Sequence, residues 1–338
     1  GGSNVAVGQD ALYANTTADN NTAIGKGAMV ANTTGTQNVA IGASTLDTNT
    51  TGGQNTAMGY AAMDNNTTGT QNTAVGGLAL DANTTANNNT AVGYASLTGA
   101  TTGANNTAVG MNSMVANTTG GSNVAIGGSA LTANTTASNN TAVGNDALAA
   151  NTTGTRNVAV GATSLDANTT ANDNTAIGYD AMSSNTTGQM NVAVGTYAFD
   201  ANTEGDFNVA VGRAALSANT TADHNTAIGY QALDVNSTGA QNVAIGAAAL
   251  DANTTASYNT AVGYNSLTAN TTGTENAAGG WNALAVNTTG NYNTAFGAGS
   301  LDANTTASSN TAFGHKALTE NTTGSSNVAV GVTTLDAN

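Results

Sequence analysis

The sequence contains no cysteine, no proline and very little charge, with four basic and 19 acidic residues among 338. The lack of cysteine excludes a disulfide framework. No stretch approaches the roughly 18 consecutive apolar residues of a membrane-spanning helix, so we expect this segment to make no contact with a membrane. Leu, Ile, Val and Phe together supply only about one residue in seven. This composition excludes a large aliphatic core, and in an irregular sequence it would be typical of disorder.

The charges that are present exclude several classes of function. The formal net charge is −15, and the basic residues are too few to form a nucleic-acid-binding patch: Lys26, Arg156, Arg213 and Lys316. The two histidines, His224 and His315, stand 91 residues apart. Without cysteine or a histidine cluster, we expect no enzyme activity, no catalytic residues, no metal site and no bound cofactor.

The most regular feature of the sequence is a 17-residue repeat without insertion or deletion. Asn4, Asn21 and Asn38 begin the first three copies, and the series continues to Asn327. Numbered from this asparagine, the consensus is N-[TV]-A-[VI]-G-x-x-A-L-x-A-N-T-T-[GA]-x-x. A fixed period in a chain so poor in apolar residues predicts stacked coils, because each coil then buries its few apolar side chains against neighbouring copies.

The pattern within one repeat favours β-structure. β-branched residues alternate over positions 1 to 5, and Asn-Thr-Thr-Gly is unfavourable in a helix. We therefore predict an all-β fold, a parallel β-solenoid or β-roll of about twenty 17-residue coils with two short strands per coil. The first strand is expected near positions 1 to 5 and the second near positions 8 to 14. Glycine at position 5 and a small residue at position 15 mark the bends. Residues 1–338 are expected to form a single uninterrupted array.

The alternation of side chains along the first strand predicts which columns are buried. Position 4 is apolar in 19 repeats and position 9 in all twenty, so we expect core columns at Val7, Ile24, Ile41, Leu12, Met29 and Leu46. Positions 3 and 5 would then point outward as a face that packs against another chain: Ala6, Ala23, Ala40, Gly8, Gly25 and Gly42. The alternative places alanine inside a thin roll and leaves position 4 as an exposed apolar stripe. Both arrangements predict lateral association.

Two asparagine columns, at positions 1 and 12, are expected to form ladders of stacked amides: Asn4, Asn21, Asn38, Asn15, Asn32 and Asn49. The second column also lies in Asn-Thr-Thr sequons, so Asn15, Asn32 and Asn49 are candidate glycan acceptors. Since an asparagine in an inward ladder cannot carry a glycan, the two predictions exclude each other, and we favour the ladder.

Acidic and aromatic residues occupy the variable columns. Position 10 is Asp in nine repeats, and Asp47, Asp64 and Asp81 belong to consecutive coils. We favour a solvated acidic edge over a Ca²⁺ site, because the Asp-rich nonapeptide of Ca²⁺-binding solenoids is missing. Aromatic residues at position 6, such as Tyr60 and Tyr94, are interpreted as scattered surface residues, with ligand contacts as the alternative.

The strand and the segment after it, A-L-x-A-N-T-T-G, resemble the head repeats of trimeric autotransporter adhesins and related repeats of phage tail fibres. The resemblance is carried by Val39-Ala40-Ile41-Gly42, Val124-Ala125-Ile126-Gly127 and Val243-Ala244-Ile245-Gly246. It covers the whole chain, although the 17-residue coil is longer than the usual head repeat. The resemblance implies a left-handed parallel β-roll, three chains around one axis, surface display and adhesion.

We therefore expect a structural segment of an extracellular fibre or adhesin at a bacterial or phage-like cell surface. The expected partners are copies of the chain, as lateral oligomers (a trimer by the resemblance) or end-to-end filaments, and a surface receptor or glycan. Because neither end carries a distinct capping sequence, we expect a segment of a longer fibre. The alternative is an ice-binding solenoid, which needs outward threonines in adjacent ranks, whereas alternation sends one of two consecutive threonines inward.

Overall fold

The computed structural model describes residues 1–336 and confirms an all-β parallel solenoid. Strands of three residues recur every 17 residues, and no helix occurs in this described part of the chain. The chain divides into two compact units, residues 1–172 and 173–338. Asn338, which the repeat places at position 12, lies outside the described residues.

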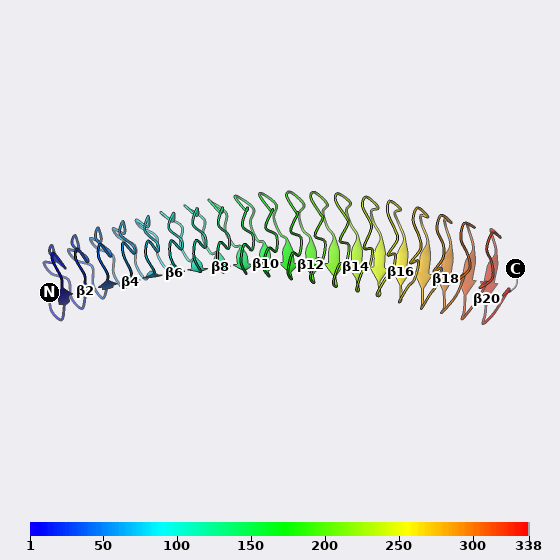
Figure 1. The fold of residues 1–338 in the computed structure, drawn as a ribbon, viewed down its shortest axis with the longest axis horizontal. Helices are drawn as coiled ribbons and strands as arrows, with labels where there is room; N and C mark the ends of the chain where they lie inside the picture. Colours follow the sequence, from blue (N-terminus) through cyan, green and yellow to red (C-terminus); the bar gives the residue numbers. More distant parts are fainter. Residues whose placement is uncertain (337–338) are drawn as a thin grey trace. The chain divides into compact units, whose positions relative to one another are not determined.

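Each unit contains ten strands within the described residues (Figure 1). Those of the first unit are β1 (Val5–Val7), β2 (Thr22–Ile24), β3 (Val39–Ile41), β4 (Thr56–Met58), β5 (Thr73–Val75), β6 (Thr90–Val92), β7 (Thr107–Val109), β8 (Val124–Ile126), β9 (Thr141–Val143) and β10 (Val158–Val160). Those of the second unit are β11 (Thr175–Ile177), β12 (Val192–Val194), β13 (Val209–Val211), β14 (Thr226–Ile228), β15 (Val243–Ile245), β16 (Thr260–Val262), β17 (Ala277–Gly279), β18 (Thr294–Phe296), β19 (Thr311–Phe313) and β20 (Val328–Val330).

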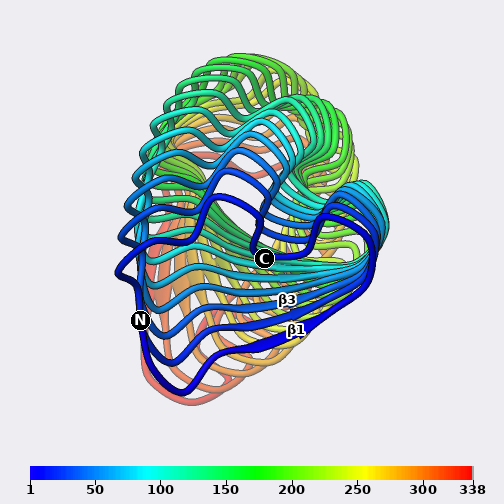
Figure 2. The ribbon, with the colours of Figure 1, turned by 90° about the vertical axis from the view of Figure 1, so that its left-hand side faces the viewer.

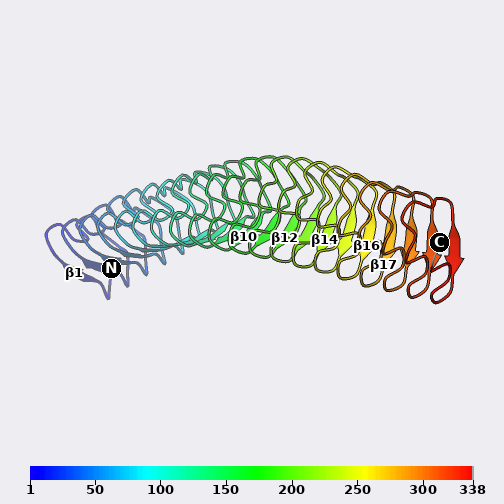
Figure 3. The same ribbon diagram turned by 45° about the vertical axis from the view of Figure 1, so that its right-hand side comes forward.

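Successive strands within a unit pair in parallel with a register of one repeat. Ala23 of β2 lies opposite Ala6 of β1 and Ala40 of β3. In the second unit, Ala227 of β14 lies opposite Ala210 and Ala244 in the same way. Figure 2 shows β1 and β3 on one side of the stacked coils, and Figure 3 shows the strands of the second unit side by side. Equivalent residues therefore form columns with a spacing of about 4.8 Å.

The strand faces the opposite way from our first prediction. Ala23 and Ala40 at position 3 are completely buried, whereas Val7 and Ile24 at position 4 are 56% and 38% exposed. The prediction of a core column at Val7, Ile24 and Ile41 is wrong, because these side chains are exposed or half-buried. The predicted outward face is wrong at Ala23 and Ala40, whereas Ala6 and Gly8 of the first coil are exposed and Gly25 and Gly42 are half-buried at the bend. The alternative, with alanine inside and position 4 exposed, is the arrangement that the structure has.

The physical reason is the limited room inside the coil. Position 9 is buried as predicted, at Leu12, Met29 and Leu46, and the asparagines of positions 1 and 12 also point inward. Opposite these side chains only a methyl group fits, because protein interiors are close-packed. The β-branched residues at positions 2 and 4 are therefore displaced to the outside.

The second predicted strand is absent, since the backbone of positions 6 to 11 is a series of turns. Positions 7 and 9 have positive φ, as in Gly27 (67°) and Met29 (55°). This alternation turns both Ala28 and Met29 into the core, which consecutive residues of a strand cannot do. Hydrogen bonds between coils continue nevertheless, for example from Met29 N to the carbonyl of Thr45 at 3.0 Å.

The glycine at position 5 forms the predicted bend. Gly25 has φ of 139°, and a Cβ there would overlap the carbonyl group of Gly42 in the next coil. Glycine is therefore required both by the backbone conformation and by the close stacking of coils.

Candidate functional surfaces

The asparagine columns form the predicted ladders inside the solenoid, but not at Asn15, whose Oδ1 is buried without a hydrogen-bond partner. Asn21 Oδ1 accepts a hydrogen bond from Asn38 N at 2.9 Å, and Asn32 Oδ1 accepts one from Asn49 Nδ2 at 2.8 Å. The carbonyl oxygen of Gly52 then accepts from Asn38 Nδ2 at 2.9 Å and from Asn49 Nδ2 at 3.0 Å. These amides thus satisfy buried backbone groups as well as one another, which is how a thin core can hold so many polar side chains.

The same geometry contradicts the prediction of glycan acceptors. Asn32 and Asn49 are completely buried, and their amide nitrogens donate hydrogen bonds. Asn15, in the first coil, is half-buried and donates from Nδ2 to the carbonyl of Ala18 at 3.3 Å. An N-linked sugar would have to replace these bonds inside the coil, so the sequons do not mark glycosylation sites of the folded solenoid.

The outer strand face, which we define as the side chains at positions 2 and 4, is a stripe of β-branched and apolar residues. Met58 and Ile126 at position 4 are 43% and 40% exposed, and the residues at position 2 are half-buried in most coils. In the second unit, Phe296 covers the place where Gly279 has no side chain and stacks on Phe313 with ring centroids 5.5 Å apart. Each unit therefore presents a row of apolar side chains at position 4, flanked by Thr, Val or Ala at position 2.

A threonine column runs along each unit at position 14, with Thr in 18 of 19 repeats and Glu204 as the exception. Position 13 is half-buried in most coils, and its hydroxyl bonds to the next coil, as from Thr33 Oγ1 to the carbonyl of Thr50 at 3.1 Å. Ser237, the one substitution at position 13, keeps this bond. Position 14 is different, because Thr34 and its equivalents are exposed and their hydroxyls have no partner in the described residues.

The aspartates of position 10 form an acidic edge. Burial raises the pKa of Asp64, and the neighbouring carboxylates of Asp47 and Asp81 raise it further. Burial also raises the pKa values of Asp47 and Asp81 themselves. Within residues 1–336 no three acidic, histidine or cysteine side chains are grouped so that they could hold a metal ion. Stacking identical coils therefore places like-charged carboxylates next to one another, which is electrostatically unfavourable.

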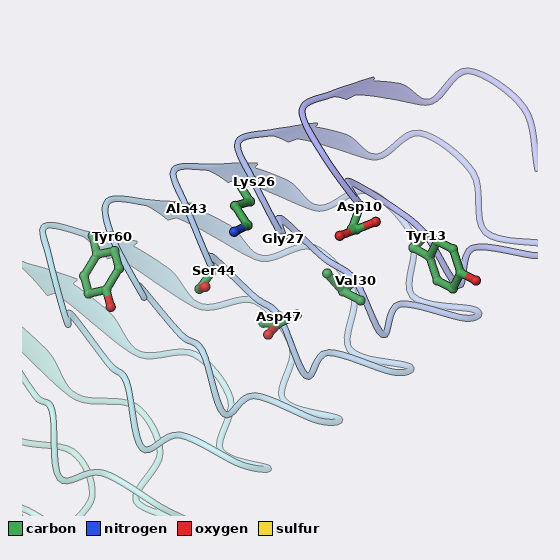
Figure 4. Close-up of a pocket in the computed structure, with 9 residues that line it drawn as sticks. All are labelled: Asp10, Tyr13, Lys26, Gly27, Val30, Ala43, Ser44, Asp47 and Tyr60. Atoms are coloured by element: carbon green, nitrogen blue, oxygen red, sulfur yellow. The ribbon is translucent and has the colours of Figure 1, made fainter.

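A cleft of about 610 Å³ opens on the turns of the first four coils (Figure 4). It is lined by side chains of positions 6, 7 and 10: Asp10, Tyr13, Lys26, Gly27, Val30, Ala43, Ser44, Asp47 and Tyr60. The small residues at Gly27 and Ala43 leave the space, and Tyr13 and Tyr60 stand at its two ends. The sequence did not predict this cleft. Positions 6, 7 and 10 vary from repeat to repeat, so a few small residues in neighbouring coils do not stand out.

The histidines and aromatic residues of the second unit lie at separate places on its surface. The ring of His224 stacks on Phe207 with centroids 5.0 Å apart, and Arg213 lies 5.8 Å from the ring centroid of Tyr230. His315, at position 6, is exposed. These contacts join neighbouring coils and do not bring a nucleophile, a base and an acid together.

No family model matches the chain, and no curated protein matches it either. Among residues 1–336, no helix has the length and apolar character needed to cross a bilayer.

Proposed function

We propose that this chain is a structural segment of an extracellular fibre or adhesin, displayed at a bacterial or phage-like surface, and that it associates laterally with copies of itself. The observation that carries the proposal is the outer strand face. A row of half-exposed Ile, Val, Met and Phe side chains along each unit is larger than the isolated apolar residues of ordinary surfaces, and such stripes mark association sites.

The rest of the architecture supports a structural role over an enzymatic one. The interior is filled by methyl groups, leucines and amide ladders that repeat in every coil, which stiffens each unit without creating a reaction chamber. A trimer, as implied by the resemblance to adhesin head repeats, would cover the outer strand face of each chain. End-to-end filaments remain a second form of the same self-association.

Sedimentation velocity tests this proposal. The unaltered chain is expected to sediment as an oligomer, whereas the double variant Ile24→Lys and Ile126→Lys is expected to be monomeric, because two lysines per chain would be buried in the interface. Tyr94→Lys is the control, since Tyr94 is 58% exposed but lies outside the outer strand face. A monomeric unaltered chain, or equal association of all three proteins, would contradict lateral assembly.

Ice binding is the second candidate, and the threonine column favours it. The column carries both a methyl and an unpaired hydroxyl at intervals of about 4.8 Å, it is interrupted by Glu204, and neither Ser nor Val replaces Thr in it. Simple alternation would place the threonine of position 13 in the core, but it is half-buried in most coils. The threonines of positions 13 and 14 are therefore both partly accessible from outside. Thermal hysteresis that disappears in Thr51→Tyr but not in Tyr94→Ala would establish this function in place of the structural one.

A further inference from the structure

We propose that the cleft between Tyr13 and Tyr60 binds a neutral, extended oligosaccharide. The proposal rests on the adhesin function above and gives it a ligand class. The cleft is comparable in volume to small-ligand sites, which range from about 300 to 1,000 Å³. It crosses four consecutive coils, so its long direction follows the stacking of the first unit.

The two tyrosines provide the apolar part of the site. Tyr13 and Tyr60 are 78% and 66% exposed, and neither contributes to the core. A tyrosine ring offers a flat apolar face and a polar hydroxyl, which matches the C–H face and the hydroxyl rim of a pyranose ring. Because the rings stand at opposite ends of the cleft, they favour a ligand of several sugars over a single one (Figure 4).

The side chains between the tyrosines provide hydrogen bonds of both kinds. Asp10 and Asp47 are acceptors, whereas the ammonium group of Lys26 is a donor and the hydroxyl of Ser44 is both. Lys26 has no ion-pair partner in the described residues, so its donors are available to a ligand. Sugar hydroxyls can donate to the carboxylates and accept from the ammonium group at the same time.

The charge of the site decides between neutral and acidic sugars. Two carboxylates outnumber one ammonium group among the lining side chains, and the whole chain carries a net charge of −15. An anionic sugar would be repelled by both. Gly27 contributes by its missing side chain, which leaves the floor of the cleft open between Lys26 and Ser44.

Isothermal titration of the full chain tests the proposal with cellotetraose and chitotetraose as neutral probes and tetragalacturonic acid as the acidic probe. At least one neutral probe is expected to bind, and the acidic probe is expected not to. Tyr60→Ala and Lys26→Met should each weaken binding at least tenfold. Tyr94→Ala is the matched control, since Tyr94 occupies the same repeat position as Tyr60 outside the cleft.

Three outcomes would overturn the proposal: no binding of either neutral probe, binding that survives Tyr60→Ala and Lys26→Met, or equal loss in Tyr94→Ala. Circular dichroism of each variant shows that the fold is intact. Sedimentation of the same samples separates this proposal from lateral assembly. Oligomers that bind no sugar would refute the cleft alone, and monomers that bind sugar through Tyr60 would refute the assembly alone.

Discussion

At the scale of the residue, every coil repeats left-handed backbone at positions 7, 9 and 17, whichever residue stands there. At position 7 the column holds residues as different as Asp10 (φ 61°), Leu78 (60°) and Gly27 (67°). Left-handed backbone costs an L-residue roughly 1–2 kcal/mol, and glycine avoids this cost. Stacking therefore imposes the conformation on every coil, and glycine at position 7, as at Gly27, adopts it there without strain.

Gly27→Ala should consequently destabilise the chain by about 1 kcal/mol. Space is not the cause, since an added Cβ would lie 3.7 Å from the nearest atom, Cγ2 of Val30. Gly77→Ala is the control, because its Cβ would lie at a similar 3.6 Å from the Tyr94 ring without a left-handed φ. That variant should be stabilising by about 0.4–1 kcal/mol. Equal midpoints of urea unfolding for the two variants would contradict the role of backbone strain.

At the scale of the structural element, the asparagine ladder at position 12 joins neighbouring coils, and a change of residue type interrupts it in the first unit. Ala100 replaces asparagine at position 12 in the sixth coil. Asn83 in the preceding coil still donates to Asn66 Oδ1 at 2.7 Å, but its own Oδ1 is buried without a hydrogen-bond partner. An unsatisfied buried acceptor costs about 1–3 kcal/mol, so the gap weakens the first unit locally.

Ala100→Asn should therefore raise the unfolding free energy by about 1 kcal/mol, because the new amide can donate to Asn83 Oδ1 as in the neighbouring coils. Asn66→Ala is the opposite experiment, since it removes the donor at 2.8 Å from Asn49 Oδ1 and should be destabilising. Thermal unfolding followed by circular dichroism measures both. A lower melting temperature for Ala100→Asn would show that the sixth coil has closed around the alanine.

The sequence predicted which repeat positions form columns better than it predicted whether their side chains point inward or outward. The 17-residue period, the asparagine ladders and the buried column at Leu12 and Met29 follow from repeat comparison, because the repeats contain no insertion, position 1 is always Asn and position 9 is always apolar. Hydrophobicity alone placed Ile24 inside and Ala23 outside, which is the reverse of the structure. Hydrophobicity does not take into account how little room the other inward side chains leave. The left-handed conformation of Met29 has no sequence signal, since leucine and methionine are not typical of it.

At the scale of the whole molecule, the stacking of identical coils brings like charges together. Burial raises the pKa of Asp64 in the first unit, and of Asp200, Asp251 and Asp302 in the second. Neighbouring carboxylates add to this effect at Asp64 and Asp251. Both units therefore contain carboxyl groups that bind protons more tightly when folded than when unfolded.

The sign of the pH dependence follows from these raised pKa values. A carboxyl group with a raised folded pKa favours the folded state when protonated, so its contribution is complete below the unfolded pKa of about 3.9 and is lost as the pH rises through the folded value. These groups should therefore make the chain more stable at a pH near the unfolded pKa than at neutral pH.

Asp64→Asn should accordingly raise the melting temperature at neutral pH, and the difference in melting temperature from the unaltered chain should vanish in acid. Melting curves recorded from acid to neutral pH measure this effect, and a gain from Asp64→Asn that is largest in acid would contradict the proposed cost of stacking carboxylates.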